Sequence, residues 1–176
     1  LDQFSRKTPS NTILKTVLAS VNNYKECEKV FNENHPHIVF HAAAYKHVPI
    51  QELHPWTAVN TNIGGTLNIV GLSDKYSVDK FVLVSTDKAV NPVNVMGATK
   101  RAAEKLIQSY NALSSKTTFM AVRFGNVLGS SGSAIPTFQK QINEGGPITI
   151  THPEMTRYFM SIQEASQLIL QCGALG

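Results

Sequence analysis

Residues 80–88 read Lys-Phe-Val-Leu-Val-Ser-Thr-Asp-Lys, an apolar run that ends in a group of polar side chains. The run Ile-Val-Phe at residues 38–40 is likewise uninterrupted by polar residues. Strands have such continuous apolar sequences when helices cover both faces of a parallel sheet. Segments with helical periodicity separate these runs along the chain, as in repeated βαβ units. The sequence therefore predicts an α/β fold built on a doubly wound parallel sheet.

The predicted strands and helices alternate over the chain of 176 residues. Strands are expected at about Thr12 to Leu18, His37 to Ala43, Lys80 to Thr86, Thr117 to Phe124 and Ile148 to Thr151. Helices are expected near Asn23 to Asn34, Trp56 to Tyr76, Val95 to Leu113, Ala134 to Glu144 and Gln163 to Ala174. Ser161 and Glu164 match the S-x-x-E capping box, in which two side chains satisfy free backbone N–H groups at a helix start.

The composition is that of one ordinary globular domain, with 42% hydrophobic and 16% charged residues. The net charge is +4, but the basic residues form no stripe with stacking aromatics, so we expect no nucleic-acid partner. Cys27 and Cys172 lie far apart in sequence, which favours two reduced thiols in a cytoplasmic protein, and no metal site is predicted. No apolar run approaches the roughly 20 residues of a membrane span, so no membrane contact is expected within this segment.

The opening residues contain no strand followed by a glycine turn, which a complete dinucleotide-binding fold uses to hold a pyrophosphate. Gly125, Gly129 and Gly132 follow a predicted strand, but their spacing is loose, and we expect a flexible loop beside the substrate. We therefore predict that residues 1–176 form part of an NAD(P)-binding, Rossmann-like domain without its first strand, its glycine-rich loop and its C-terminal part. The substrate-binding part is expected to begin at about residue 125.

Ligands of an open parallel sheet bind beyond the carboxyl ends of its strands, so the residues that follow each apolar run are candidates for a site. Small residues and then polar ones follow three of the predicted strands: Ala42-Ala43-Ala44-Tyr45-Lys46-His47, Ser85-Thr86-Asp87-Lys88 and Arg123-Phe124-Gly125-Asn126. This pattern favours a backbone that approaches a flat ligand, with hydrogen-bonding groups beyond it. The alternative is that polar residues follow these strands only because loops are exposed.

The helix predicted from Val95 has a lysine on its apolar face. Five residues of that face recur at helical spacing: Met96, Lys100, Ala103, Ile107 and Tyr110. A lysine that faces inward loses hydration, so it needs a paired carboxylate, a bound anion or a sugar hydroxyl. The alternative is that Lys100 lies at the edge of the stripe and extends its amine to water.

Five motifs together resemble one family: His41-Ala-Ala-Ala-Tyr-Lys-His-Val-Pro49, Ser85-Thr-Asp-Lys-Ala-Val-Asn-Pro92, Met96-Gly-Ala-Thr-Lys100, Arg123-Phe-Gly-Asn-Val-Leu-Gly129 and Thr151-His-Pro-Glu-Met-Thr-Arg-Tyr-Phe-Met160. They resemble the UDP-N-acetylglucosamine 4,6-dehydratases, the polysaccharide-biosynthesis branch of the extended short-chain dehydrogenase/reductases. The resemblance extends from Asp2 to the last helix. Met96 stands where most short-chain dehydrogenases have the tyrosine of Tyr-x-x-x-Lys, and this resembles the larger, membrane-anchored members.

The resemblance implies NAD or NADP as cofactor and a UDP-sugar as substrate. In such dehydratases hydride leaves sugar C4, water is lost across C5 and C6, and the hydride returns to C6. The implied catalytic roles are Lys88 as the C5 base, Asp87 as the acid for the C6 hydroxyl and Thr86 as a donor to the C4 oxygen. Asp87 or a water held by Thr86 would take the C4 hydroxyl proton, because Met96 cannot.

The remaining implied residues hold the two ligands. Lys100 would bind the nicotinamide ribose. The cofactor would also contact Asp2, Ala42, Ala43, Ala44, Asn62 and Phe124. For Asn62 a glycine pair that allows close helix packing is the alternative explanation. Lys46, Asn126 and Arg157 would bind the sugar nucleotide, with Arg157 on the diphosphate.

Two other functions remain open from the sequence. The first is a nucleotide-sugar 4-epimerase of the same fold, which also oxidises C4 but eliminates no water. The second is a non-catalytic fragment or assembly module, because the missing glycine loop predicts little activity of this polypeptide alone. Unpaired strand edges favour association, and we expect a homo-oligomer. A cytoplasmic location is expected, with the parent protein attached to the inner face of the membrane if it carries an upstream anchor.

Overall fold

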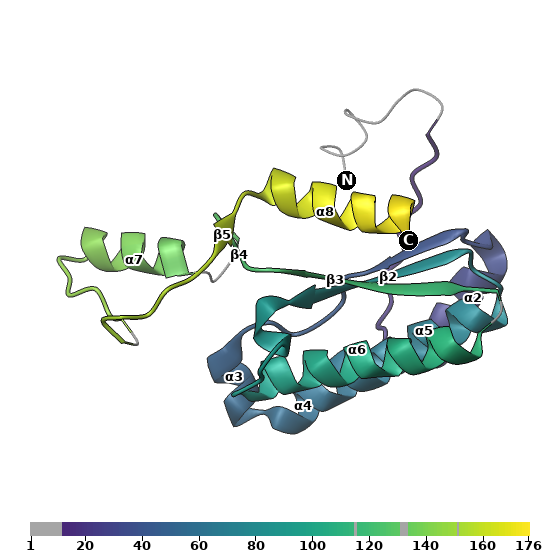
Figure 1. Ribbon diagram of the computed structural model, residues 1–176, viewed down its shortest axis with the longest axis horizontal. Helices are drawn as coiled ribbons and strands as arrows, with labels where there is room; N and C mark the ends of the chain where they lie inside the picture. Colours follow the sequence, from purple (N-terminus) through teal and green to yellow (C-terminus); the bar gives the residue numbers. More distant parts are fainter. Residues whose placement is uncertain (1–11, 115, 131–133, 151) are drawn as a thin grey trace.

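A three-stranded parallel sheet forms the centre of the computed structural model, which describes residues 12–114, 116–130, 134–150 and 152–176. Its strands are β1 (Ile38–His41), β2 (Lys80–Thr86) and β3 (Thr118–Phe124), in the order β1-β2-β3. The ladder of β2 and β3 ends at the pair Thr86 and Phe124. Figure 1 shows α5 and α6 below the sheet and α8 above it. The predicted doubly wound parallel sheet is therefore confirmed.

The side chains of β2 explain its continuous apolar sequence. Phe81 and Leu83 are fully buried and belong to the core that α5 and α6 cover. Val82 points to the other face, where Gly173 of α8 packs so closely that a Cβ there would lie 3.5 Å from the valine side chain. Because successive residues of a strand face opposite sides, a helix on each side buries all three.

The described helical segments are α2 (Tyr24–Asn34), α3 (Val48–Leu53), α4 (Pro55–Val59), the π-helix η1 (Asn60–Gly65), α5 (Thr66–Lys75), the 3-10 helix η2 (Asp87–Ala89), α6 (Val95–Leu113), α7 (Ala134–Asn143) and α8 (Ile162–Leu175). The five predicted helices are confirmed to within a few residues. The one predicted over Trp56 to Tyr76 consists of α4, η1 and α5 in succession. The capping box at Ser161 and Glu164 is formed in both directions.

The predicted strand at Thr12 to Leu18 is wrong. These residues form no regular element and are exposed, and Ile13 is 84% exposed to solvent. A strand is stabilised by hydrogen bonds to a neighbouring strand, and in the described part of the chain no strand lies beside this segment.

The strand predicted at Ile148 to Thr151 is also wrong for its described residues, 148–150; Thr151 lies outside the described residues. The backbone there bonds to a side chain and not to a strand, because Thr149 N donates a hydrogen bond of 3.1 Å to the side-chain oxygen of Gln141. The short parallel pair of this region is instead β4 (Asn126–Val127) with β5 (Phe159–Met160). This pair connects the end of β3 to the segment that precedes α8.

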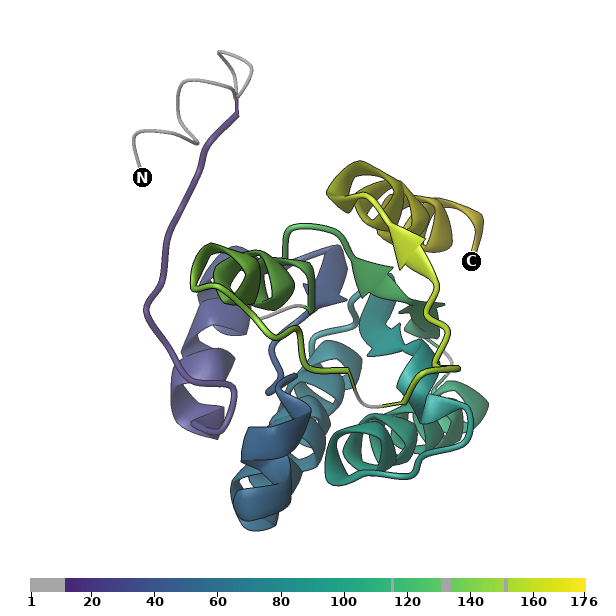
Figure 2. The same cartoon turned by 90° about the vertical axis from the view of Figure 1, so that its left-hand side faces the viewer.

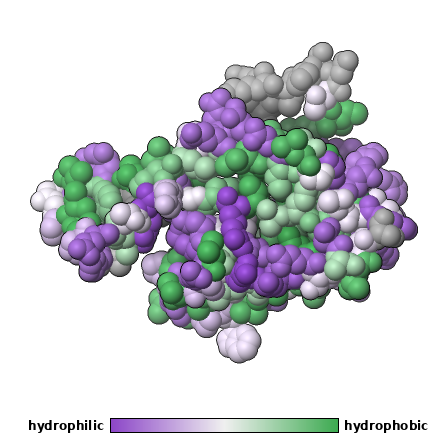
Figure 3. Space-filling model, in the orientation of Figure 1, coloured by the Kyte–Doolittle hydropathy of each residue, from purple (hydrophilic) through white to green (hydrophobic). Residues whose placement is uncertain are grey.

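Residues 134–150 and 152–158 form an arm that projects from the sheet. Figure 1 shows α7 and the chain after it standing beyond β4 and β5, away from the helices that cover the sheet, and Figure 2 shows α7 from the side that faces the viewer. Hydrophobic residues are exposed on this arm (Figure 3), among them Ile135, Ile142, Ile148 and Ile150. Among the described helices, none is both long enough and apolar enough to cross a membrane.

Candidate active site

Thr86, Asp87 and Lys88 converge at the carboxyl end of β2. The chain turns there into η2, so the three side chains share one tight corner. Thr86 Oγ1 donates to Asp87 Oδ1 at 2.9 Å, and Lys88 Nζ donates to the same oxygen at 3.0 Å. The Asp87 and Lys88 side chains are about a third exposed. The corner therefore presents a hydroxyl, a carboxylate and an amine together, within reach of solvent.

Asn126, the first residue of β4, completes this corner. Lys88 Nζ donates a second hydrogen bond, of 3.1 Å, to Asn126 Oδ1. The parallel register pairs Thr86 with Phe124, so the residues that follow each strand leave the sheet side by side. The structure thus brings together Lys88 and Asn126, for which the family resemblance implies different roles, as the C5 base and as a substrate-binding residue.

The charge of Asp87 follows from its surroundings. Burial raises the pKa of this carboxyl, but hydrogen bonds from Lys88 and Thr86 outweigh that effect and hold the pKa below its usual value. Asp87 is therefore a carboxylate at neutral pH. Before it can act as an acid, it has to take up a proton.

Lys100 lies beneath the same strand end. Asn94 caps α6 by accepting from Gly97 N at 2.8 Å, and the helix then buries Met96 and Lys100. Only 8% of Lys100 is exposed, so its amine does not extend to water. The amine instead donates to the carbonyl oxygen of Val84 at 2.8 Å. Burial lowers the Lys100 pKa to about 8, and the Glu104 carboxylate partly offsets this effect.

The start of α6 packs directly on the corner formed by Thr86, Asp87 and Lys88. A Cβ added to Gly97 would clash with the carbonyl oxygen of Lys88. Glycine is thus required at this position, because it lets the helix approach the backbone of η2. The spacing Met96-Gly-Ala-Thr-Lys100 therefore places the lysine one turn below that contact.

The loop after β1 is held by Asn62 of η1. The Asn62 side chain accepts from Tyr45 N at 2.8 Å and donates to Tyr45 O at 3.2 Å and to Thr99 Oγ1 at 2.9 Å. Asn62 is almost fully buried, whereas Ala42 and Ala43 of the loop are exposed. We interpret Asn62 as the residue that shapes the loop, and the alanines as the surface offered to a ligand.

Not all of the predicted site residues are brought together. Lys46 is exposed on the loop after β1, and Arg157 is exposed on the arm, where it donates to the carbonyl of Thr156. Phe124 is partly buried at the end of β3. Asp2 lies outside the described residues. The structure therefore joins Thr86, Asp87 and Lys88 to Asn126, whereas among the described residues no side-chain hydrogen bond links Lys46 or Arg157 to this group.

In the segment after β3, which was predicted to be a flexible loop beside the substrate, Gly125 has a packing role. A Cβ there would lie 2.7 Å from the carbonyl oxygen of Tyr158, so this glycine lets the arm cross closely over the strand end. Gly129 adopts a φ of 71°, which favours glycine. Gly132 lies outside the described residues.

Sequence reasoning missed two buried residues near the site. His41 ends β1, and its Nε2 lies 3.0 Å from Thr66 Oγ1; because the Thr66 hydroxyl donates to Asn62 O, the imidazole is the donor. Burial and the nearby Lys100 lower the His41 pKa to about 4.

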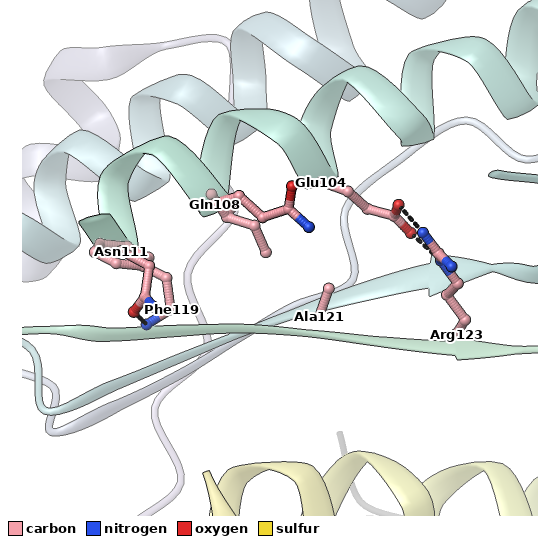
Figure 4. A pocket seen from close by; sticks show the side chains of 7 residues that line it. Glu104, Gln108, Asn111, Phe119, Ala121 and Arg123 are labelled. Atoms are coloured by element: carbon pink, nitrogen blue, oxygen red, sulfur yellow. Dashed lines mark hydrogen bonds and ion pairs between the residues drawn. The ribbon is translucent and has the colours of Figure 1, made fainter. Parts of the chain in front are cut away.

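The second residue is Glu104 of α6, which is bound by Arg123 of β3 through two hydrogen bonds (Figure 4). Glu104 lies four residues after Lys100 on the same face of the helix, and this spacing could have identified it from the sequence.

A hollow of about 520 Å³ lies between α6 and β3 (Figure 4). Its lining residues are Glu104, Ile107, Gln108, Asn111, Phe119, Ala121 and Arg123. Thr86, Asp87 and Lys88 do not line it, so it is separate from the corner that they form. Within the described ranges no group of three or more His, Cys, Asp or Glu side chains could hold a metal ion.

The chain matches the family model of the polysaccharide biosynthesis proteins over residues 2–176. It belongs to this family. The capsular polysaccharide biosynthesis protein CapD of Staphylococcus aureus is 59% identical over 170 residues, which are 96% of this chain and 28% of that protein. A UDP-glucose 4-epimerase of Rickettsia canadensis is 44% identical over 163 residues, which are 92% of this chain and 47% of the relative.

The solved structures show the same fold. The structure of Pen from Bacillus thuringiensis matches 99% of this chain and 53% of its own, with 38% identity and a TM-score of 0.88. The resemblance to the polysaccharide-biosynthesis branch of the extended short-chain dehydrogenase/reductases is thereby confirmed. This chain spans about a quarter to a half of the length of these three proteins.

Proposed function

We propose that the parent protein is an NAD(P)-dependent 4,6-dehydratase of a UDP-sugar, with UDP-N-acetylglucosamine as substrate, and that this chain carries its catalytic corner. The observation that carries the proposal is the convergence of Thr86, Asp87, Lys88 and Asn126 beyond β2. An elimination of water needs a base for one proton and an acid for the leaving hydroxyl. This corner holds a candidate for each, 3.0 Å apart.

The residues at the strand ends fit the nicotinamide side of a dinucleotide. The exposed backbone of Ala42 and Ala43 has no large side chain to exclude a flat ring, and Asn62 holds this loop in place. The buried Lys100 amine lies below the neighbouring strand end and would hold the ribose. When bound, the nicotinamide would supply an acceptor for the C4 hydride and return that hydride to C6.

The protein groups can account for each proton of a dehydration. Asp87, a carboxylate in the free protein, accepts the proton of the C4 hydroxyl as C4 becomes a ketone. The ketone acidifies C5, and Lys88, as the base, removes the C5 proton. Asp87 then gives its proton to the departing C6 hydroxyl, which leaves as water. Lys88 finally returns its proton to C5, so both groups end in their starting states.

A nucleotide-sugar 4-epimerase is the second candidate, because a relative with 44% identity is named as a UDP-glucose 4-epimerase. An epimerase would also oxidise C4, and Asp87 would accept the same hydroxyl proton. It would have no use for a second group that removes a proton from C5. The role of Lys88 therefore separates the two candidates.

The test is to incubate the full-length protein with UDP-N-acetylglucosamine and to follow the product by NMR. A 4-keto-6-deoxy sugar is the expected product, whereas a C4 epimer would decide for the epimerase. Lys88→Ala and Asp87→Asn are expected to lower turnover by about 100-fold or more, the usual contribution of acid–base groups. Lys105→Ala, an exposed lysine of α6, is the matched control and should keep full turnover. Full activity of both active-site variants would refute the assignment.

Three wider features belong to the same proposal. Residues 1–176 would be part of the NAD(P)-binding domain, with the substrate-binding part from about residue 125, where β3 gives way to the arm. The free thiols of Cys27 and Cys172 suit a protein of the cytoplasm. The exposed edge of β1, where Ile38 and Phe40 are nearly half exposed, supports assembly as a homo-oligomer.

A further inference from the structure

Glu104 is a buried carboxylate with four hydrogen bonds to protein side chains. Its side chain is only 3% exposed. Arg123 binds both oxygens, with Nε to Oε1 at 2.7 Å and an Nη to Oε2 at 2.6 Å. Ser85 Oγ donates to Oε1 at 2.7 Å, and Arg101 donates to Oε2 at 3.0 Å. A buried charge is retained only when such partners satisfy it.

Two of these partners belong to the strand ends that carry the catalytic corner. Ser85 precedes Thr86 in β2, and Arg123 precedes Phe124 in β3. The two residues are register partners in the parallel ladder. Glu104 therefore joins both strands to α6 one residue before the ladder ends.

Beyond that point no strand pairing holds the two segments together, as β2 continues into η2 and β3 into β4. The 3.1 Å contact between Lys88 and Asn126 bridges them there. A small rotation of either strand end would separate those side chains, because no ladder hydrogen bonds follow the pair Thr86 and Phe124.

We propose that Glu104 is a positioning residue, which clamps the ends of β2 and β3 through Ser85 and Arg123 and so keeps Lys88 and Asn126 in contact. This inference rests on the proposed function for the roles of those two residues. The clamp itself is a property of the fold, and it makes a prediction that does not depend on the reaction.

Arg101 provides a matched control for Arg123. Both arginines bind Glu104 Oε2, and their side chains are similarly exposed, at 34% and 37%. Arg101, however, lies on α6 itself, three residues before Glu104, and joins no strand to the helix. Removing either arginine deletes one positive charge beside Glu104, but only the loss of Arg123 releases a strand end.

The experiment compares Arg123→Gln with Arg101→Gln in the full-length protein. In a crystal structure of Arg123→Gln, we expect Lys88 Nζ and Asn126 Oδ1 to lie beyond hydrogen-bond range, about 3.5 Å. Turnover of the UDP-sugar should fall about 10- to 100-fold, the effect of a small misplacement of reacting groups, with KM changed less than kcat. Arg123→Lys should restore part of the turnover. Arg101→Gln should keep both the contact and the turnover.

Equal losses of turnover in Arg101→Gln and Arg123→Gln would overturn the proposal, as would an intact contact between Lys88 and Asn126 in Arg123→Gln. If Arg123→Gln does not fold, Ser85→Ala releases the β2 end more gently and should separate the same two side chains. If the unaltered protein does not act on the sugar, the proposed function fails, and the variant crystal structures still decide about the clamp.

Discussion

The end of β2 and the arm that carries Arg157 differ in how their polar side chains are held. Thr86, Asp87 and Lys88 bind one another, and Lys88 also binds Asn126. Arg157 donates only a bond to the carbonyl of Thr156, its neighbour in the chain, among the interactions described for it. The first region lies over buried elements, whereas the second projects beyond the sheet (Figure 1).

From this difference we expect the strand end to serve the chemical reaction and the arm to serve substrate binding. Side chains that are held before the substrate arrives lose little freedom in the reaction, which favours the chemical step. An exposed arginine gains its partner when an anionic ligand binds, and part of the binding energy then orders its side chain. Variants at the strand end should therefore change stability and turnover, and variants on the arm should change substrate affinity.

The largest expected effect concerns Glu104, which anchors the strand end. Glu104→Gln should lower the free energy of unfolding by about 3 kcal/mol at pH 7, because Arg123 and Arg101, each about a third exposed, lose the charge to which they donate their hydrogen bonds. Burial raises the Glu104 pKa, but bonds from Arg123, Ser85 and Arg101 outweigh it, and the net pKa is lowered. A lowered pKa stabilises the fold above the unfolded pKa and loses that effect as the pH falls through the folded pKa.

Urea unfolding from pH 7 down to pH 3 measures this difference. The gap between the unaltered protein and Glu104→Gln should be full at pH 7 and should close as the pH falls below about 4.5, near the ordinary pKa of glutamate. Glu28→Gln is the control, since Glu28 forms a more exposed pair with Lys75 and should cost less than about 1 kcal/mol. A gap that does not change with pH would contradict the assignment of Glu104 as a paired carboxylate.

The second effect concerns the buried Lys100. Its pKa of about 8 in the folded chain lies below the ordinary lysine value, so between about pH 8 and pH 10.5 the unfolded state binds more protons. As the pH rises over that range, the free energy of unfolding of the unaltered protein should increase by up to about 3 kcal/mol relative to that of Lys100→Met. Thermal unfolding at pH 7, 8, 9 and 10 tests this. Lys105→Met, at an exposed position of the same helix, should show no such gain.

The smallest effect is expected on the arm. Arg157→Gln should raise KM for the UDP-sugar about tenfold, through loss of one charged hydrogen bond, and leave kcat within about twofold. Steady-state kinetics of the full-length protein measure both constants. Lys140→Gln removes an exposed charge from the same arm and should change neither. A loss of kcat in Arg157→Gln would remove the distinction between the two regions.

The sequence predicted the sheet and the buried Lys100 because both depend on local patterns. A continuous apolar run at residues 80–84 requires cover on both faces, and a lysine on an apolar helical stripe requires a partner. The exposed segment from Thr12 to Leu18 is also rich in β-branched residues, but strand formation depends on a neighbouring strand, which composition does not reveal. Glu104 was missed for a similar reason, since its partners Ser85 and Arg123 meet it only after the strands pair.

The most direct test of the catalytic corner is a crystal structure of the full-length protein with UDP-N-acetylglucosamine and the reduced cofactor, a pair that cannot react. We predict Lys88 Nζ and the Asp87 carboxylate within hydrogen-bond reach of the sugar, about 3 Å, on the C5 and C6 side, with Lys100 against the nicotinamide ribose. A sugar ring bound away from the Thr86-Asp87-Lys88 corner, or a cofactor on the opposite face of the sheet from Lys100, would contradict the proposed active site.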